Sequence, residues 1–198
     1  MNVLTPKAVA LAALVPVLWT FADAPLLTFR QRFVAHRWAE RMVLFSIELN
    51  LLLLWVLAKV LVGRDVPISP DGAERAFGWA GAVLAWAGSL FTTWAKWTLG
   101  VWFSATFGVK PWHKLVTSGA YAVVRHPIYT GALVMGAGIA VAYDSWLTLG
   151  FVALYAIPFT MHAAIEDQML AAHFGDEWRL YKLRVPSLVP FWRPRVPS

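Results

Sequence analysis

Residues 127–165 read PIYTGALVMGAGIAVAYDSWLTLGFVALYAIPFTMHAAI, and this stretch decides the predicted fold. It holds two apolar segments, 127–143 and 146–165, which are separated only by Asp144 and Ser145. So short a connection predicts a tight helical hairpin, with Asp144 and Ser145 able to cap the second helix. Small residues that permit close contact with another helix recur in the first segment: Gly131, Gly136 and Gly138.

Three further apolar segments precede the hairpin, at residues 8–29, 42–62 and 76–95. Each of the five is near the roughly 20 residues that a helix needs to cross a bilayer, the segment at 127–143 being short. The apolar runs are continuous rather than alternating, which argues against membrane strands. We therefore predict an all-α integral membrane protein with five transmembrane helices.

The composition supports a membrane protein and excludes several other classes. The chain is 59% hydrophobic and only 14% charged, whereas a soluble domain carries about 25% charged residues. It has no cysteine, so disulfides, thiolate metal sites and a cysteine nucleophile are excluded. The net charge of +6 predicts contact with membrane lipids rather than with nucleic acid, because the positive residues lie between apolar segments.

The basic residues cluster after the first, third and fifth segments. Five crossings place these three regions on one side, which the positive-inside rule makes cytoplasmic. The amino terminus is then outside, and the carboxyl terminus is inside. The basic residues of the cytoplasmic side are Arg30, Arg32, Arg37, Arg41, Lys96, Lys110, Lys114, Arg125, Arg179, Lys182, Arg184, Arg193 and Arg195.

The remaining segments complete a single membrane domain over residues 1–198. Residues 1–75 hold two N-terminal spans, and residues 76–198 form a core that carries the candidate site. Apolar residues near the i, i+4, i+8 spacing predict an amphipathic helix over 166–183. The proline-rich tail at 184–194 is expected to lie extended along the interface.

A polar, basic and turn-rich stretch at residues 113–131 is the candidate functional region. Polar groups at a membrane boundary are costly unless they have partners, so their presence indicates a site. The hairpin would bring Arg125, His126 and Tyr129 close to Glu166 and Asp167. A small zwitterionic ligand would fit such a site, because it would meet basic side chains on one side, acidic side chains on the other and aromatic side chains at the edges.

Three motifs in this region resemble a known family. They are HxLVTSGxY at 113–121, RHPxYxG at 125–131 and EDxxLxxxFGxxWxxYxxxVP at 166–186. In this order and spacing, on a chain with several spans, they resemble isoprenylcysteine carboxyl methyltransferases and their prokaryotic relatives. The resemblance covers about residues 78–191.

The resemblance implies a membrane enzyme that transfers a methyl group from S-adenosylmethionine. It places the site on the cytoplasmic side and implies a lipophilic acceptor that enters from the bilayer, with no metal and no obligate protein partner. Pro127 would fix the start of its helix, and Glu166 would accept hydrogen bonds from the cofactor. The implied cofactor contacts are His113, Lys114, Leu115, Val116, Tyr121, His126, Pro127, Ile128, Tyr129 and Glu166.

One position departs from the family pattern. Relatives that methylate a prenylcysteine carboxylate carry an arginine one helical turn before the cofactor-binding glutamate, where this chain has His162. Histidine lacks the permanent charge and the bidentate geometry of arginine. His162 and Arg125 are our candidate catalytic residues, and His162 or His126 is able to accept a proton from a thiol or amine acceptor.

The acceptor therefore stays open. A prenylcysteine-type carboxylate or another lipophilic small molecule is expected first, and a small thiol or a phospholipid amine is the alternative. Two other classes are a non-catalytic membrane protein on the same scaffold and a sterol-type reductase that uses a nicotinamide cofactor. Glu48 and Asn50 are polar residues within the second segment, and they predict hydrogen bonds between helices rather than catalysis.

Overall fold

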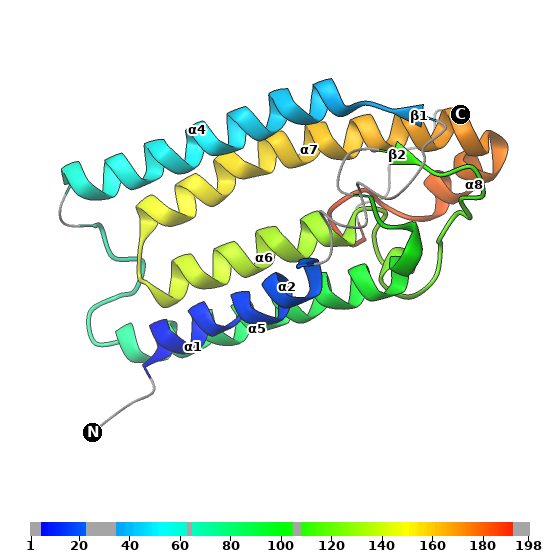
Figure 1. Ribbon diagram of the computed structural model, residues 1–198. Helices are drawn as coiled ribbons and strands as arrows, with labels where there is room; N and C mark the ends of the chain where they lie inside the picture. The colour runs from blue at the N-terminus through cyan, green and yellow to red at the C-terminus, as the bar shows by residue number, and fades with distance from the viewer. Residues whose placement is uncertain (1–4, 23–34, 63–64, 105–107, 192–198) are drawn as a thin grey trace, which may run out of the picture.

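The computed structural model describes residues 5–22, 35–62, 65–104 and 108–191 (Figure 1). The regular elements are α1 (Pro6–Ala12), α2 (Leu14–Phe21), β1 (Ala35–His36), α4 (Trp38–Val62), α5 (Glu74–Leu99), η1 (Gly100–Trp102), β2 (Gly108–Val109), η2 (Gly119–Ala122), α6 (Pro127–Ala142), α7 (Trp146–Phe174) and α8 (Asp176–Arg184).

The helices form a bundle in which α4 lies beside α7 and α5 lies beside α6 (Figure 1). Helices α1 and α2 pack on α5, and α6 also contacts α7. The predicted hairpin is confirmed, since α6 ends at Ala142 and α7 begins at Trp146. The short elements η1 and η2, the strands β1 and β2, and α8 gather at one end of the bundle (Figure 1).

The hairpin turn is stabilised from two directions. Ser145 accepts a hydrogen bond from the Thr148 backbone N–H at 2.9 Å, which confirms it as the cap of α7. Asp144 has a positive φ of 55° and accepts instead from the backbone N–H groups of Ile68 and Ser69, each at 2.7 Å. Asp144 therefore fastens the loop between α4 and α5 to the hairpin.

Glycines bring α5 and α6 into backbone contact. A Cβ atom added to Gly138 would lie 2.2 Å from the backbone nitrogen of Ala85, and one added to Gly81 would lie 2.3 Å from that of Ala142. Gly88 and Gly131 face the partner helix in the same way. The close contact expected for the glycines of α6 is thus confirmed, and it fixes α5 and α6 as a rigid pair.

Helix α4 identifies the surrounding medium as a membrane. Residues 39–60 are apolar enough to cross a bilayer, yet only 6% of their most apolar window is buried. A core helix of a soluble protein would be mostly buried, so this exposed apolar surface is in keeping with a membrane-spanning helix. Residues 146–174 of α7 also satisfy the length and composition of a span. Within the described ranges these two helices meet both requirements, and the count of five crossings stays a prediction.

Three sequence predictions need correction. Residues 166–183 are helical as predicted except at Gly175, but they form two pieces: α7 continues to Phe174, and α8 begins at Asp176 after Gly175, whose φ is +53°. The first segment has a one-residue break at Ala13 between α1 and α2, three residues before Pro16, and a proline disfavours a continuous helix because it lacks the N–H group and crowds the carbonyl four residues earlier. The fold also contains a two-stranded antiparallel ladder, β1–β2, in which Ala35 pairs with Val109. The continuation of the first segment beyond residue 22 lies outside the described residues.

We expect the α5–α6 contact to be intolerant of one added methyl group. Gly138→Ala should lower the free energy of unfolding by about 1–3 kcal/mol, because backbone atoms must move apart to admit the Cβ. Thermal unfolding of the detergent-solubilised protein, followed by circular dichroism, measures the change. Gly150→Ala is the matched control, because a Cβ at this position in α7 meets nothing within 4 Å. Equal midpoints for the two variants would contradict the proposed packing.

Candidate active site

The carboxy-terminal chain straps the start of α6 in place. The backbone N–H of Arg125 donates to the carbonyl of Pro186 at 2.8 Å, and that of His126 donates to Ser187 at 3.1 Å. The Thr130 hydroxyl donates to the carbonyl of Leu188 at 2.7 Å. The described part of the tail thus packs on the protein, and residues 192–194 of the predicted interfacial tail lie outside the description.

Asp167 neutralises two buried cationic groups at the start of α6. It accepts from Arg125 Nη2 at 3.0 Å and lies 2.7 Å from His126 Nε2. The side chains of Arg125 and His126 are each only 3% exposed. Arg125 also donates to the carbonyls of Lys182 and Val185. Because a buried charge needs partners, Asp167 is essential to this end of the bundle.

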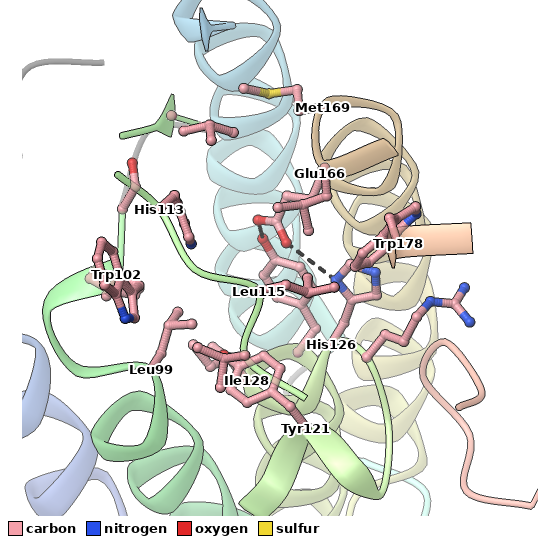
Figure 2. A pocket seen from close by; sticks show the side chains of 18 of the residues that line it. Leu99, Trp102, His113, Leu115, Tyr121, His126, Ile128, Glu166, Met169 and Trp178 are labelled. Atoms are coloured by element: carbon pink, nitrogen blue, oxygen red, sulfur yellow. Dashed lines mark hydrogen bonds and ion pairs between the residues drawn. The ribbon is translucent and has the colours of Figure 1, made fainter. Parts of the chain in front are cut away.

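Glu166 is directed by two residues of the second motif. It accepts a short hydrogen bond from the Tyr129 hydroxyl, and it lies 3.2 Å from His126 Nδ1. Its side chain is 30% exposed, twice the 14% of Asp167. His126 therefore bridges two adjacent carboxylates, while Glu166 keeps contact with the cavity beside it (Figure 2).

His126 is held as a cation by these partners. Burial alone would lower its pKa, but the hydrogen bonds to Asp167 and Glu166 and the charges of both carboxylates outweigh burial and raise the pKa. Both ring nitrogens are then donors. His126 in this arrangement positions Glu166 and has no lone pair with which to accept a proton.

A cavity of about 290 Å³ lies between the end of α5, the 108–116 loop, the start of α6 and the end of α7. Its volume is near the lower end of the roughly 300–1,000 Å³ typical of small-molecule sites. Figure 2 shows Trp102 and His113 on one side and Glu166 and His126 on the other, with Ile128 below. Most of the wall is apolar or aromatic, and a few polar groups converge on it.

Three buried polar atoms of the cavity residues have no hydrogen-bond partner among the described residues. They are Nδ1 of His113, Nε of Arg125 and Nε1 of Trp178. The His113 ring stacks on Trp102 with 5.3 Å between ring centroids. Burial, followed by the charges of Lys110 and His173, lowers the pKa of His113 to about 4, so the ring is neutral near pH 7. Unpaired buried polar atoms on a cavity wall are suited to bind a ligand.

The structure brings most of the sequence-predicted site residues to this cavity. Eight of the ten predicted cofactor contacts line it, and Arg125 also reaches its wall. Lys114 is exposed and Pro127 is buried, and neither is among the lining side chains. The lining residues from the predicted set are His113, Leu115, Val116, Tyr121, His126, Ile128, Tyr129 and Glu166.

The two candidate catalytic residues have other partners. The guanidinium of Arg125 donates to Asp167 and to the carbonyls of Lys182 and Val185. Arg125 therefore links the start of α6 to α7 and α8. His162 is fully buried and lies outside the cavity lining, in contact with Glu48 and Arg41 of α4. The interhelical hydrogen bond predicted for Glu48 is confirmed. A catalytic role for either candidate stays a prediction.

Sequence reasoning missed several cavity residues. Trp178 and Tyr181 belong to the third motif, so their spacing from Glu166 was a usable signal. Trp102 was hidden among many aromatic residues expected at the interface. Arg41 lines the cavity from α4, and no local pattern distinguishes it from the neighbouring basic residues. Among the described residues, no cluster of three or more His, Cys, Asp or Glu is placed to hold a metal ion.

Comparison with models of protein families assigns the chain to one of them. The model of the phospholipid methyltransferase family (PEMT) matches residues 77–177, about half of the chain. The chain belongs to this family. The matched region runs from α5 through the cavity loop, α6 and α7 to the start of α8. Helices α1, α2 and α4 of this family member lie outside the match, and so does Arg41.

Similar curated proteins match a shorter region. Protein-S-isoprenylcysteine O-methyltransferase of Schizosaccharomyces pombe is 35% identical over 79 residues, which is 39% of this chain and 34% of that protein. The Arabidopsis thaliana protein-S-isoprenylcysteine O-methyltransferase B is 36% identical over 80 residues, 40% of this chain and 41% of its own length. Methanethiol S-methyltransferase 1 of Bradyrhizobium diazoefficiens is 41% identical over 76 residues, 38% of this chain and 26% of its own length.

A solved structure shows that the fold extends beyond that region. The family member superposes on the eukaryotic intramembrane Ras methyltransferase ICMT (isoprenylcysteine carboxyl methyltransferase) with a TM-score of 0.61. The superposition covers 96% of this chain and 69% of that chain at 20% identity. At this identity the likeness establishes a shared fold, including α4 and the N-terminal helices.

We expect Asp167→Asn to destabilise the site end of the bundle, because Arg125 would stay buried without its carboxylate. The expected loss in the free energy of unfolding is about 3–5 kcal/mol. Thermal unfolding in detergent measures it. Arg179→Gln is the control, since the ion pair of Arg179 with Asp176 is 80% and 90% exposed and should contribute little. Similar shifts in both variants would show that Asp167 has no special role.

His113 should make stability depend on pH. The pKa of His113 is about 4 in the fold and near the ordinary histidine value of 6.5 in the unfolded chain, so protonation favours unfolding. The stabilisation is complete above about pH 6.5 and is lost as the pH falls toward about 4. Lowering the pH from about 7 to about 5 should lower the thermal midpoint less in His113→Gln than in the wild type. Parallel decreases would refute this assignment.

Proposed function

We propose that this chain is a membrane methyltransferase that uses S-adenosylmethionine and acts on a lipophilic acceptor. The observation that carries the proposal is the single cavity into which residues of all three sequence motifs converge. The cavity lies at one end of a bundle whose α4 exposes apolar side chains to lipid. An acceptor dissolved in the bilayer would therefore reach the cavity by lateral diffusion.

The residues of the cavity fit the parts of S-adenosylmethionine. The Glu166 carboxylate suits the ribose hydroxyl groups, and the apolar wall with Leu99 and Ile128 suits the adenine ring. His113 and Trp178 each offer a buried polar atom that has no partner within the part of the chain that the structure describes. When bound, the cofactor would supply a methyl group on a sulfonium: an acceptor lone pair would form a bond to the methyl carbon, and the electron pair of the broken carbon–sulfur bond would leave with the sulfur.

The protein contributes orientation and a dry environment. Tyr129 and His126 hold the Glu166 carboxylate in one position. Because this group is already placed in the folded protein, the entropic cost of orienting the bound reactants is lower. Apolar and aromatic walls exclude water from the methyl group. A carboxylate acceptor has no proton to lose and needs no base. The reaction therefore does not require His126, whose two ring nitrogens are engaged by Glu166 and Asp167.

Three acceptor classes are each favoured by a particular observation. The similarity to protein-S-isoprenylcysteine O-methyltransferases supports a lipophilic carboxylate. The similarity to methanethiol S-methyltransferase 1 supports a small thiol as the second candidate, whose proton must leave before or during transfer. A phospholipid amine is the third, in keeping with the description of the family model.

We also propose that the chain crosses the membrane five times with the cavity on the cytoplasmic side. The described basic residues of the three predicted cytoplasmic regions lie at the cavity end of their helices, as the arrangement of α4 to α7 requires (Figure 1). Residues 1–75 would form the N-terminal spans, and residues 76–198 would form the core that binds the cofactor.

Binding of S-adenosylhomocysteine to the purified protein tests this function directly. Isothermal titration in detergent should give saturable binding, whereas NADPH should not bind. No binding of S-adenosylhomocysteine at millimolar concentration by folded protein would refute the proposal. Preferential binding of NADPH would favour a reductase on the same scaffold.

Glu166→Gln should weaken S-adenosylhomocysteine binding about tenfold to a hundredfold. The change removes the charge from a carboxylate that lines the cavity, and a hydrogen bond to a charged group contributes about 1.5–3 kcal/mol. Glu177→Gln on the exposed surface of α8 is the matched control and should bind as the wild type does. Unchanged affinity in Glu166→Gln would remove Glu166 from the cofactor site.

A further inference from the structure

A partly buried polar chain joins α4 to α7 beside the cavity. His162 is fully buried, and its Nε2 lies 2.6 Å from Oε1 of Glu48. Nη1 of Arg41 lies 3.0 Å from each of the two His162 ring nitrogens. Arg41 and Glu48 are seven residues apart, or about two helical turns, so both present side chains to the same face of α4.

The partners of His162 define what its ring can do. Nε2 of His162 is the ring nitrogen next to the Glu48 carboxylate. The Arg41 guanidinium lies within hydrogen-bond distance of the same ring. His162 therefore links a cation and an anion of α4 to α7, and this arrangement holds Arg41 in place.

Arg41 is the member of this chain that reaches the cavity. It lines the same wall region as Tyr129 and Glu166, whereas Glu48 and His162 do not line the cavity. The His162 ring packs against Tyr129 with 5.8 Å between ring centroids, so the chain lies directly behind the residue that orients Glu166. A guanidinium therefore faces the cavity from the lipid-exposed helix.

We propose that Arg41 is the specificity-determining cation of the cavity, which binds an acidic group on the acceptor, and that His162 and Glu48 are its positioning residues. This inference rests on the proposed function and identifies how that site would select its acceptor. A planar guanidinium binds a carboxylate through two parallel hydrogen bonds. In this chain that group comes from α4 and not from the position of His162 on α7.

Two observations assign Arg41 to the acceptor and not to the cofactor. Arg41 lies outside residues 77–177, the region common to the family, and a cofactor common to a family should be held by its common region. Arg41 also stands at the edge of an apolar surface, because the next residue, Met42, is 48% exposed and Phe45 is 52% exposed. An amphiphile could place its apolar chain along α4 and its acidic group at Arg41.

Paired ligands test the proposal. An N-acetylated cysteine with a long S-alkyl chain is titrated as the free acid and as its carboxamide into detergent-solubilised protein. The wild type should bind the acid about tenfold to a hundredfold more tightly. Arg41→Gln should bind both ligands equally, and Arg41→Lys should keep part of the preference, because lysine retains the charge without the bidentate geometry.

The control variant is Arg37→Gln, at the residue that immediately precedes α4. Arg37 pairs with Glu40 and Gln168 and does not line the cavity, so the preference for the acid should persist in this variant. Glu48→Gln should reduce the preference partly, since Arg41 would keep its charge and lose its support. Equal binding of acid and carboxamide by the wild type, or an undiminished preference in Arg41→Gln, would overturn the proposal.

A second titration separates acceptor binding from cofactor binding. S-adenosylhomocysteine carries a carboxylate, and 5′-methylthioadenosine lacks the amino-acid part. Arg41→Gln should leave the affinity for both nucleosides unchanged. Weaker binding of S-adenosylhomocysteine alone would assign Arg41 to the cofactor and overturn the proposal. Failure of the wild type to bind S-adenosylhomocysteine, with the acid preference retained, would refute the proposed function and leave the role of Arg41 intact.

Discussion

Two adjacent carboxylates on one turn of α7 govern the site end of this protein. Asp167 offsets the buried charges of Arg125 and His126, and without it these groups would have to leave the protein interior. Because Asp167 provides this neutralisation, Glu166 can face the cavity while His126 and Tyr129 orient it. The start of α6 and the strap formed by the tail follow from the same contacts, since Arg125 binds carbonyls of that tail.

The cavity has two sides with different physical origins. On one side α5, the following loop, α6 and α7 form a rigid unit, because glycine backbones of α5 and α6 are in contact and allow no adjustment. On the other side α4 is exposed to lipid and is joined to α7 by the buried chain from Arg41 through His162 to Glu48. A rigid side suits a cofactor of fixed shape, and a lipid-exposed side suits an acceptor that arrives from the bilayer.

The polar groups of α4 also explain why His162 is no simple replacement for a cationic residue. A buried histidine between a guanidinium and a carboxylate serves both neighbours and satisfies its own two nitrogens. The positive charge near this position is supplied by a different helix. A change at one site of a buried polar chain thus has to be interpreted together with residues that are more than a hundred positions away in the sequence.

The sequence by itself determined the apolar helices, the hairpin at Asp144 and Ser145, and the convergence of residues 113–129 with Glu166. These features depend on local composition, periodicity and short connections, which are all visible along the chain. Only the tertiary structure decided that α7 continues through Glu166 to Phe174, because partners from α6 accommodate polar residues that would otherwise indicate a helix end. It alone placed Arg41 at the cavity, since which helix lies beside α7 is decided by packing, and no local pattern encodes it.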